Sequence, residues 1–310
     1  MKNKYQIDIC VIGVGFLGEY HVQQLINNSN ANLVGFYDTN ESRSEYITQQ
    51  YNIKHKSLDE LFTQSQAACI VTPTTTHFDI ASKAISSNCH VFIEKPITDT
   101  VLESDRLIKY ANRKNLIIQV GHIERFNPAY KQLIKYNINP QFIECHRLST
   151  FSDRSLDISV ILDLMIHDID LICDIKKHNI SNIEATGVSV ISKSIDIANA
   201  RISFEDGAVA NLTASRISQK SMRKLRIFSK GNYLNLDLLN KKVDIYSIDK
   251  NGLAKRSNMS DKNQQSGNAL NDELNNFIDS IYHKKQPLIN GESGKMALEI
   301  ALEIQGLILG

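Results

Sequence analysis

Up to about residue 121, short apolar runs alternate with segments of helical periodicity. The apolar runs predict buried strands at residues 7–13, 32–38, 67–73, 90–96 and 116–121. Between them, apolar side chains recur every three or four positions, which predicts helices over 16–27, 41–51, 57–64, 76–87 and 101–115. Strands that alternate with helices are typical of an α/β Rossmann domain, a doubly wound parallel sheet with helices on both faces.

After residue 121 the pattern changes. A predicted strand at 141–150 and a strongly apolar helix at 160–175 are followed by strand-like runs without helices between them, over 183–191, 197–204, 208–215, 224–229, 232–238 and 241–248. This order predicts an α+β domain with a mostly antiparallel open sheet. The polar segment 249–268 is expected to be a loop, and two helices close the chain. We therefore predict a first domain over 1–121 and a second over 122–310.

The composition argues against several classes of protein. The formal net charge is +1, whereas a nucleic-acid-binding protein usually has a basic excess. No apolar run approaches the ~20 residues of a membrane-spanning helix, and the N-terminus does not resemble a signal peptide. The five cysteines are scattered and never spaced as C-x-x-C, so neither disulfides nor a zinc site are expected. We expect a cytoplasmic protein that binds neither nucleic acid nor membrane.

Gly13, Gly15 and Gly18 form a G-x-G-x-x-G pattern directly after a predicted strand and at the start of a predicted helix. In that context the pattern indicates a dinucleotide-binding loop. The first glycine permits a tight turn, the second lets a pyrophosphate approach the backbone, and the third lets helix and strand pack closely. The helix N-terminus, with Phe16 and Leu17, would offer its free N–H groups to the phosphates.

Asp38 ends the next predicted strand, 20 residues after Gly18. A carboxylate at this point hydrogen-bonds the adenosine ribose hydroxyls and repels a 2′-phosphate, and no arginine follows immediately, so NAD is favoured over NADP. The alternative is a structural glycine turn in which Asp38 caps a helix.

Polar and charged residues also end two later strands, at the edge where open α/β sheets carry their substrate sites. Thr72 and Pro73 follow one strand, near the expected nicotinamide half of the cofactor, and Glu94 and Lys95 end the next. A buried, half-paired lysine is costly, which favours a Lys95 that faces a cleft and does chemistry there. Glu94 could pair with Lys95 or contact the cofactor.

In the second domain, Asp163 and His167 are four residues apart on a predicted helix, so they share one helix face. A histidine backed by a carboxylate is a plausible general base, because the carboxylate orients the imidazole and stabilises its charged form. The alternative is an ordinary helix with an i,i+4 pair.

Taken together, "VIGVGFLGEYH", "TPTTTH", "EKPIT" and D-x-x-x-H occur in the order and approximate spacing of the glucose–fructose oxidoreductase / inositol dehydrogenase / rhizopine-catabolism (Gfo/Idh/MocA) family, which essentially the whole chain resembles. The resemblance implies hydride transfer between a sugar or cyclitol carbon and a nicotinamide. It matches Lys95, Asp163 and His167 to the family's catalytic residues and assigns His77, the last residue of "TPTTTH", to the cofactor site. It also implies a Lys95–Pro96 bond that is often cis, and a homodimer or homotetramer.

Further stretches, "VGHIERFNPAY", "RSLDISVILDLMIHDIDL" and "LTASRIS", resemble the branch of this family that oxidises C3 of UDP-N-acetylglucosamine. This resemblance implies a nucleotide-sugar substrate and a 3-keto product for a partner aminotransferase, as in lipid A synthesis. His122 and Arg125 are then substrate candidates, and Arg154 and Arg216 could bind the diphosphate. The alternative for the two later residues is that they are ordinary surface arginines.

Two other functions stay open. A dehydrogenase of free sugars or inositol would use the same catalytic residues, and a catalytically silent NAD-binding regulator would need none of them. The presence of both Lys95 and His167 argues against the regulator. No metal is expected, because His122, His146 and His167 lack ligand spacing and hydride transfer needs none.

Overall fold

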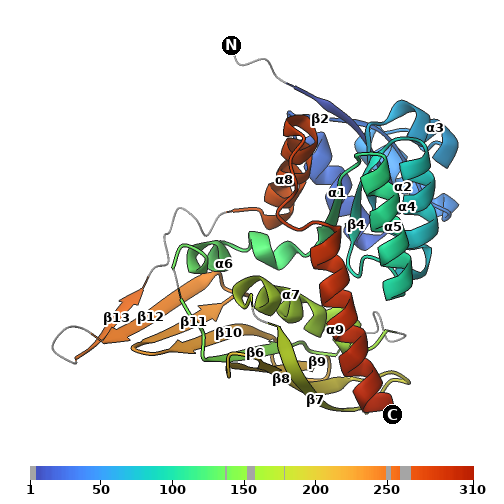
Figure 1. Cartoon of the computed structure of the whole chain (residues 1–310). Helices are drawn as coiled ribbons and strands as arrows, with labels where there is room; N and C mark the ends of the chain where they lie inside the picture. Colours follow the sequence, from blue (N-terminus) through green and yellow to red (C-terminus); the bar gives the residue numbers. More distant parts are fainter. Residues whose placement is uncertain (1–4, 137, 152–157, 178, 249–252, 259–266) are drawn as a thin grey trace. The chain divides into compact units, whose positions relative to one another are not determined.

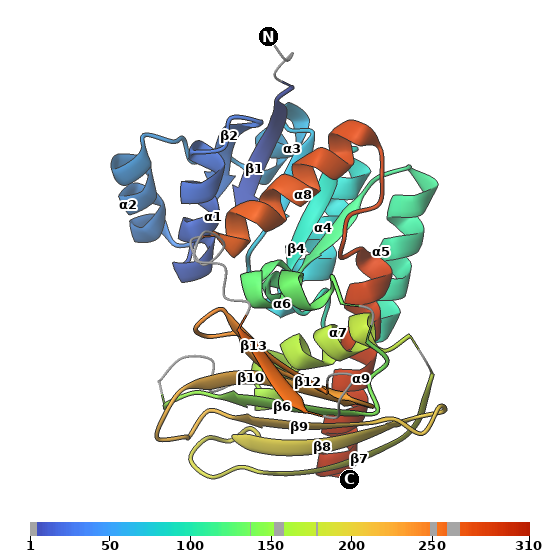
Figure 2. The same cartoon turned by 90° about the vertical axis from the view of Figure 1, so that its left-hand side faces the viewer.

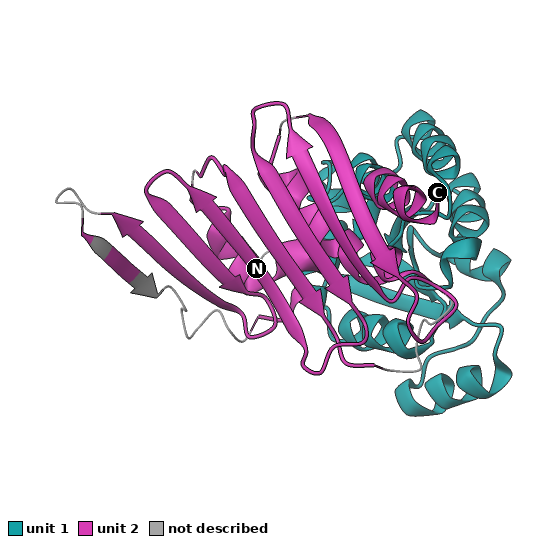
Figure 3. Cartoon of the chain, turned by 90° about the horizontal axis from the view of Figure 1, so that it is seen from below, with its two compact units in different colours: residues 1–123, 270–298 teal, residues 124–269, 299–310 magenta. Residues whose placement is uncertain are grey.

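The computed structural model describes residues 5–136, 138–151, 158–177, 179–248, 253–258 and 267–310. The chain divides into two compact units (Figure 3). Unit 1 comprises residues 1–123 and 270–298, and unit 2 comprises residues 124–269 and 299–310. Within the described ranges, no helix is both long and apolar enough to cross a membrane.

Unit 1 is built on a five-stranded parallel sheet with the strand order β2-β1-β3-β4-β5. Its strands are β1 (Ile7–Ile12), β2 (Ala31–Tyr37), β3 (Ala67–Ile70), β4 (His90–Glu94) and β5 (Ile118–Gly121). Its helices are α1 (Phe16–Ile26), α2 (Glu41–Tyr51), α3 (Leu58–Gln64), α4 (His77–Ser86), α5 (Val101–Arg113) and α8 (Ala269–His283), with a 3₁₀ turn, η1 (Thr74–Thr76). Helices α1 and α8 cover one face of the sheet, and α3, α4 and α5 cover the other (Figure 2). The predicted doubly wound sheet is confirmed.

The second part of unit 1 differs from the predicted domain division. The first boundary, after residue 121, lies close to the observed one, but residues 270–298 return to unit 1. The reason is the apolar face of α8: Leu274, Phe277 and Ile278 are buried in one core cluster with side chains of β1 and α1. Burying such side chains contributes about 1.5–3 kcal/mol each, which favours this packing over an exposed helix.

Unit 2 contains an eight-stranded sheet in the order β13-β12-β11-β10-β6-β9-β8-β7. Only β6 and β9 pair in parallel among its described strand pairs, so the expected mostly antiparallel sheet is confirmed. Its strands are β6 (Phe142–Leu148), β7 (Ile180–Val188), β8 (Ile197–Phe204), β9 (Val209–Ser215), β10 (Met222–Ser229), β11 (Asn232–Asp237), β12 (Lys242–Ile248) and β13 (Ala254–Asn258).

One strand of this sheet was not expected. Strand β13 lies in the segment 249–268 that the sequence predicts as a loop, and it pairs with β12 at the sheet edge. An edge strand forms backbone hydrogen bonds on one side and needs no apolar alternation, so hydrophobic periodicity does not reveal it.

Helices cover one face of the unit 2 sheet. They are α6 (Pro128–Leu133) and α7 (Ile166–Ile175), with a π-helical turn, η3 (Ile161–Met165), directly before α7 (Figure 1). A 3₁₀ turn, η2 (Ile123–Phe126), precedes α6, and α9 (Gly291–Leu309) ends the chain. The other face of the sheet carries no helix in the described part of the chain (Figure 3).

The glycine loop lies where the strand order of unit 1 reverses, between β1 and β3. Gly13 has a φ of +86°, and a Cβ added there would lie 2.6 Å from the carbonyl oxygen of Val71, just after β3. A Cβ on Gly18 would lie 2.0 Å from the carbonyl oxygen of Gly13, whereas a Cβ on Gly15 would meet no atom within 4 Å. The first and third glycines are therefore required by packing, and the second leaves space open.

These contacts predict that an alanine changes the stability of the protein strongly at position 18 and little at position 15. Gly18→Ala should lower the free energy of unfolding by about 1–3 kcal/mol, because the added methyl group overlaps a carbonyl oxygen. Gly15→Ala, with a φ of −58° that alanine adopts, should change it by less than about 0.5 kcal/mol. Urea unfolding followed by circular dichroism measures both, and equal losses would contradict this account of the loop.

Candidate active site

The glycine loop and the end of β2 form one hydrogen-bonded unit. Asp38 accepts the N–H of Val14 through Oδ2 at 2.7 Å and the N–H of Asn40 through Oδ1 at 2.9 Å. The side chains of Phe16 and Leu17, at the start of α1, are more than half exposed. The open space beside Gly15 is the position where a pyrophosphate would meet the loop and the α1 N-terminus, so these residues fit a dinucleotide.

Arg43 contacts this loop, and sequence reasoning missed it. It lies on α2, and its guanidinium donates through Nε to the carbonyl oxygen of Val14 at 2.6 Å and through Nη2 to that of Gly15 at 3.3 Å. Its charge is compensated by Glu19 of α1, at 2.5 Å. Arg43 thus stabilises the glycine loop through the loop's carbonyl oxygens. Sequence analysis missed it because it looked for an arginine directly after Asp38, whereas Arg43 comes five positions later.

The loops after β3 and β4 are joined by His77. This side chain is fully buried, and its ring nitrogens lie 2.9 Å from the carbonyl oxygen of Thr72 and 2.8 Å from that of Pro96. Thr72 also accepts a hydrogen bond from the hydroxyl of Thr76, and Pro73 is exposed at the edge. Burial lowers the pKa of His77, although the two carbonyl groups act in the opposite direction. These contacts give His77 an indirect role at the predicted cofactor site.

Glu94, at the end of β4, faces inward. Its Oε1 lies 2.9 Å from Nε2 of His21 on α1, and its Oε2 accepts the N–H of Lys95 at 3.2 Å. Gly121 of β5 lies opposite, and a Cβ there would be 2.8 Å from Oε2. Burial raises the pKa of Glu94, but the hydrogen bond and charge of His21 and the charge of Lys95 outweigh it, so the pKa lies below its usual value.

Lys95 follows directly and is partly buried. The Lys95–Pro96 bond is cis, as the family resemblance implies. Glycine loop, Asp38, Thr72, Glu94 and Lys95 therefore all stand at the carboxyl edge of one parallel sheet, the edge at which this architecture binds its ligands.

In unit 2, Asp163 and His167 are both partly exposed. Asp163 belongs to the π-helical turn η3, where Ile166 N–H donates to the carbonyl oxygen of Ile161, five residues back. His167 follows in the first turn of α7. The predicted continuous α-helix is thus wider where Asp163 stands, and π-helical turns are frequent at functional sites.

Arg125 is engaged by carboxylates of α7, and its role as a substrate ligand stays a prediction. It donates to Asp170 through Nε and Nη2, both at 2.7 Å, and to Asp174 through Nη1 at 2.9 Å. Arg125 and Asp170 are both buried. The pair holds α7 to η2, and its geometry is that of a bidentate structural ion pair.

A second buried ion-pair group lies on the same helix. Arg147 of β6 donates to Asp168 through Nη2 at 2.8 Å and to Glu124 through Nη1 at 2.9 Å, and all three are less than 5% exposed. Asp168 and Asp170 directly follow His167 on α7, so arginines from two other elements fix this part of the helix. Within the stretch "VGHIERFNPAY", which contains the substrate candidates His122 and Arg125, Glu124 and Arg125 take part in the ion pairs that hold α7.

The three remaining substrate candidates differ in where the structure places them. Arg216 is buried, and its guanidinium donates to the carbonyl oxygen of Ile158 and lies 3.9 Å from Asp196, so it is not a surface arginine. His122 belongs to unit 1 and is fully buried. Arg154 lies outside the described residues.

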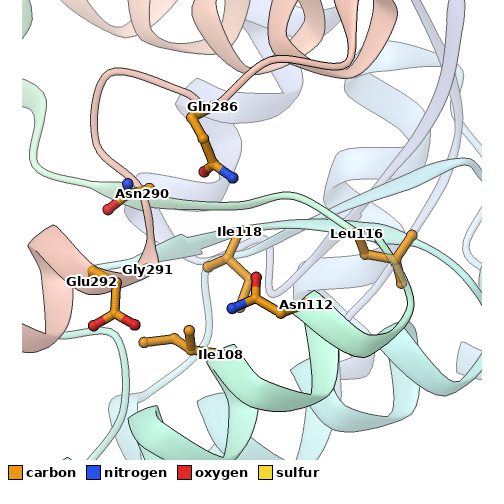
Figure 4. Close-up of a pocket in the computed structure, with 8 residues that line it drawn as sticks. All are labelled: Ile108, Asn112, Leu116, Ile118, Gln286, Asn290, Gly291 and Glu292. Atoms are coloured by element: carbon orange, nitrogen blue, oxygen red, sulfur yellow. The ribbon is translucent and has the colours of Figure 1, made fainter.

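A pocket of about 110 Å³ opens elsewhere in unit 1, and Figure 4 shows its lining side chains. They include Ile108 and Asn112 of α5 and Asn290, beside the beginning of β5 at Ile118. It is smaller than the ~300–1,000 Å³ of typical ligand pockets, and none of the predicted site residues lines it. Among the side chains that the structure describes, no cluster of three His, Cys, Asp or Glu residues could hold a metal ion.

Comparison with known proteins identifies both parts of the chain. A family model described as an oxidoreductase family with an NAD-binding Rossmann fold matches residues 7–122. A model of the GFO/IDH/MocA C-terminal domain matches residues 131–233.

Individual relatives match along nearly the whole length. A UDP-N-acetylglucosamine 3-dehydrogenase of Acidithiobacillus ferrooxidans is 34% identical over 299 residues, covering 95% of both chains. Its solved structure gives a TM-score of 0.91 at 33% identity over 98% of both chains. A scyllo-inositol 2-dehydrogenase (NAD(+)) of Bacillus subtilis is 26% identical over 96% of this chain and 93% of its own. The structure of a Lactobacillus casei scyllo-inositol dehydrogenase with NAD(H) and scyllo-inositol shares the fold, with a TM-score of 0.82 at 20% identity, covering 98% of this chain and 97% of its own.

The structural role of Arg125 predicts a large loss of stability. Arg125→Met leaves Asp170 buried without its counter-ion, which should lower the free energy of unfolding by about 3–5 kcal/mol. Arg226→Met, in the Arg226–Glu144 pair of the unit 2 sheet, whose side chains are 34% and 28% exposed, is the matched control and should lose less than about 1 kcal/mol. Urea unfolding measures both. An Arg125→Met variant of normal stability with a raised KM for substrate would contradict the structural role and support substrate binding.

Proposed function

Because the chain belongs to the GFO/IDH/MocA oxidoreductase family and is a dehydrogenase of sugar hydroxyls, we propose that it oxidises C3 of UDP-N-acetylglucosamine to the ketone with NAD. The observation that carries the proposal is the 34% identity, over 95% of both chains, to a UDP-N-acetylglucosamine 3-dehydrogenase. The inositol dehydrogenase that covers a similar share of the chain is only 26% identical.

Three side chains carry the chemistry in this proposal. His167, oriented by Asp163, takes the proton of the sugar hydroxyl as general base. Lys95, as a cation, stabilises the developing alkoxide and lowers the pKa of the hydroxyl. Lys95 and His167 could exchange these roles, since each can accept a proton. NAD, when bound by the glycine loop and Asp38, supplies the hydride acceptor.

Asp38 also supports NAD over NADP. Its carboxylate would lie at the adenosine ribose, where it favours hydroxyls and repels a 2′-phosphate. The guanidinium of Arg43 already pairs with two loop carbonyl oxygens and with Glu19, so it would not offer its full charge to a 2′-phosphate.

The product would be a 3-keto sugar, and its chemistry suits a partner aminotransferase that forms a 3-amino sugar, as in lipid A synthesis. For assembly we propose a homodimer or homotetramer that uses the helix-free face of the unit 2 sheet.

A second function is favoured by a specific observation. Arg216, one of the two predicted diphosphate ligands, and Arg125, a predicted substrate ligand, are both buried and engaged within unit 2. A dehydrogenase of a free sugar or of inositol would need no diphosphate ligand and would use the same Lys95, Asp163 and His167. A silent regulator is disfavoured, because it would not need the lysine and histidine that are present.

A substrate comparison separates the two enzymatic functions. Purified protein and NAD are mixed with UDP-N-acetylglucosamine, N-acetylglucosamine or myo-inositol, with and without an aminotransferase and glutamate that remove the ketone. NADH absorbance should rise only with the UDP-sugar, and more strongly with the trap because oxidation of the hydroxyl is uphill. Turnover with a free sugar or inositol would exclude a requirement for the nucleotide.

Substitution of the two proposed catalytic groups tests the mechanism. Lys95→Ala and His167→Ala should each lower kcat by roughly 10²–10⁴-fold, because each removes a positioned acid–base or charged group. NAD binding, followed by fluorescence titration, should persist in both. Lys83→Ala is the control for Lys95, because Lys83 is about half exposed and pairs with the exposed Asp59. Normal turnover by both active-site variants would sink the assignment.

A further inference from the structure

Lys95 is held by polar contacts on both sides of it in the chain. On the N-terminal side, the Glu94 carboxylate accepts the N–H of Lys95 itself at 3.2 Å and lies 2.9 Å from His21. On the C-terminal side, the carbonyl oxygen of Pro96 lies 2.8 Å from His77. The Glu94–Lys95 peptide group, through the Glu94 carboxylate, and the Pro96–Ile97 peptide group are thus each linked to a buried histidine.

The two histidines come from elements that form other parts of the predicted NAD site. His21 lies on α1, the helix that the glycine loop opens, and is 2% exposed. His77 is the first residue of α4, is fully buried, and contacts the carbonyl oxygen of Thr72 after β3 as well as that of Pro96. Each histidine therefore connects residues 94–96, the lysine loop, to one other part of the predicted NAD site.

Stability alone does not account for this choice of residues. Burial of polar groups is unfavourable unless they are hydrogen-bonded, and apolar side chains of similar volume would fill a core at lower cost. Around Lys95 lie two buried histidines, His21 and His77, and the partly buried Glu94, next to residues 91–93 of β4, which are buried and apolar. Such a network fixes one geometry of the groups attached to it.

We propose that His21 and His77 are positioning residues that fix the Lys95 backbone from its two sides and so hold its ammonium group in the reactive position. The inference rests on the proposed function, since it requires Lys95 to act in catalysis. A displacement of about 1 Å at a reacting group costs on the order of 10²-fold in rate, so loss of either contact should reduce turnover.

The same strand offers a matched control. His90 begins β4, whereas Glu94 ends it, and Nδ1 of His90 accepts the N–H of Ile117 at 2.9 Å. It is a partly buried histidine with a backbone hydrogen bond, at the opposite edge of the sheet from Lys95. Its loss affects the stability of the same strand without touching the lysine loop.

The experiment compares His21→Ala, His77→Ala and His90→Ala, with kcat expressed per NAD-binding site so that unfolded protein does not count. His21→Ala and His77→Ala should lower kcat by about 10–100-fold with a smaller change in the KM for sugar. His90→Ala should lower the melting temperature but keep kcat within about twofold. A normal kcat per site in the His21 and His77 variants would overturn the proposal.

Glutamine variants keep the test decisive if an alanine variant fails to fold. His21→Gln should recover much of the turnover, because an amide N–H can still donate to Glu94. His77→Gln should not, because a single amide group cannot lie near both carbonyl oxygens that the two ring nitrogens of His77 contact. The reverse order of recovery would contradict the proposed contacts.

Lys95→Ala, measured in the same series, separates the two levels of the argument. If Lys95→Ala turns over normally, the proposed function itself is wrong about the lysine. If Lys95→Ala is inactive while the His21 and His77 variants behave like His90→Ala, the lysine assignment stands and only the positioning proposal falls.

Discussion

The partly buried carboxylate of Glu94 is the group on which the ligand-binding edge of unit 1 depends. It contacts the His21 ring of α1 and accepts the N–H of Lys95, and it occupies the space that a side chain on Gly121 would need. A strand can therefore end in two adjacent opposite charges, because the glutamate has a histidine 73 residues away in the chain and a backbone N–H as partners in addition to the charge of Lys95. Residue spacing reveals the neighbouring lysine but not the distant histidine.

Unit 2 uses the same principle on a larger scale. Arg125 and Arg147 come from different elements and bind Asp170 and Asp168, which directly follow His167 on α7. Buried ion pairs of this kind add little net stability compared with apolar packing, but breaking one is costly, so they select one placement of the helix. In both units, charged groups that do no chemistry fix an element that carries a proposed catalytic residue.

Long, regular patterns made the fold predictable. The strands and helices before residue 121, the glycine loop and the mostly antiparallel second sheet follow from periodicity and turn residues that act locally. The return of α8 to unit 1 does not, because an amphipathic pattern shows that Leu274 and Phe277 are buried but not in which core. The same holds for the site: the sequence identifies Lys95 and Asp38 by their place at strand ends, whereas the partners of Arg43, Arg125 and Arg216 are set by tertiary packing that leaves no trace in residue spacing.

The central claim is that hydride leaves C3 of a UDP-linked sugar, and isotope transfer tests it most directly. UDP-N-acetylglucosamine carrying deuterium only at C3 is incubated with the protein and NAD, with an aminotransferase and glutamate to remove the ketone, and the reduced cofactor is analysed by mass spectrometry. The account predicts that one deuterium appears in the NADH formed and that none remains at C3 of the product. NADH without deuterium, formed from this substrate, would show that another carbon is oxidised and would contradict the proposed reaction.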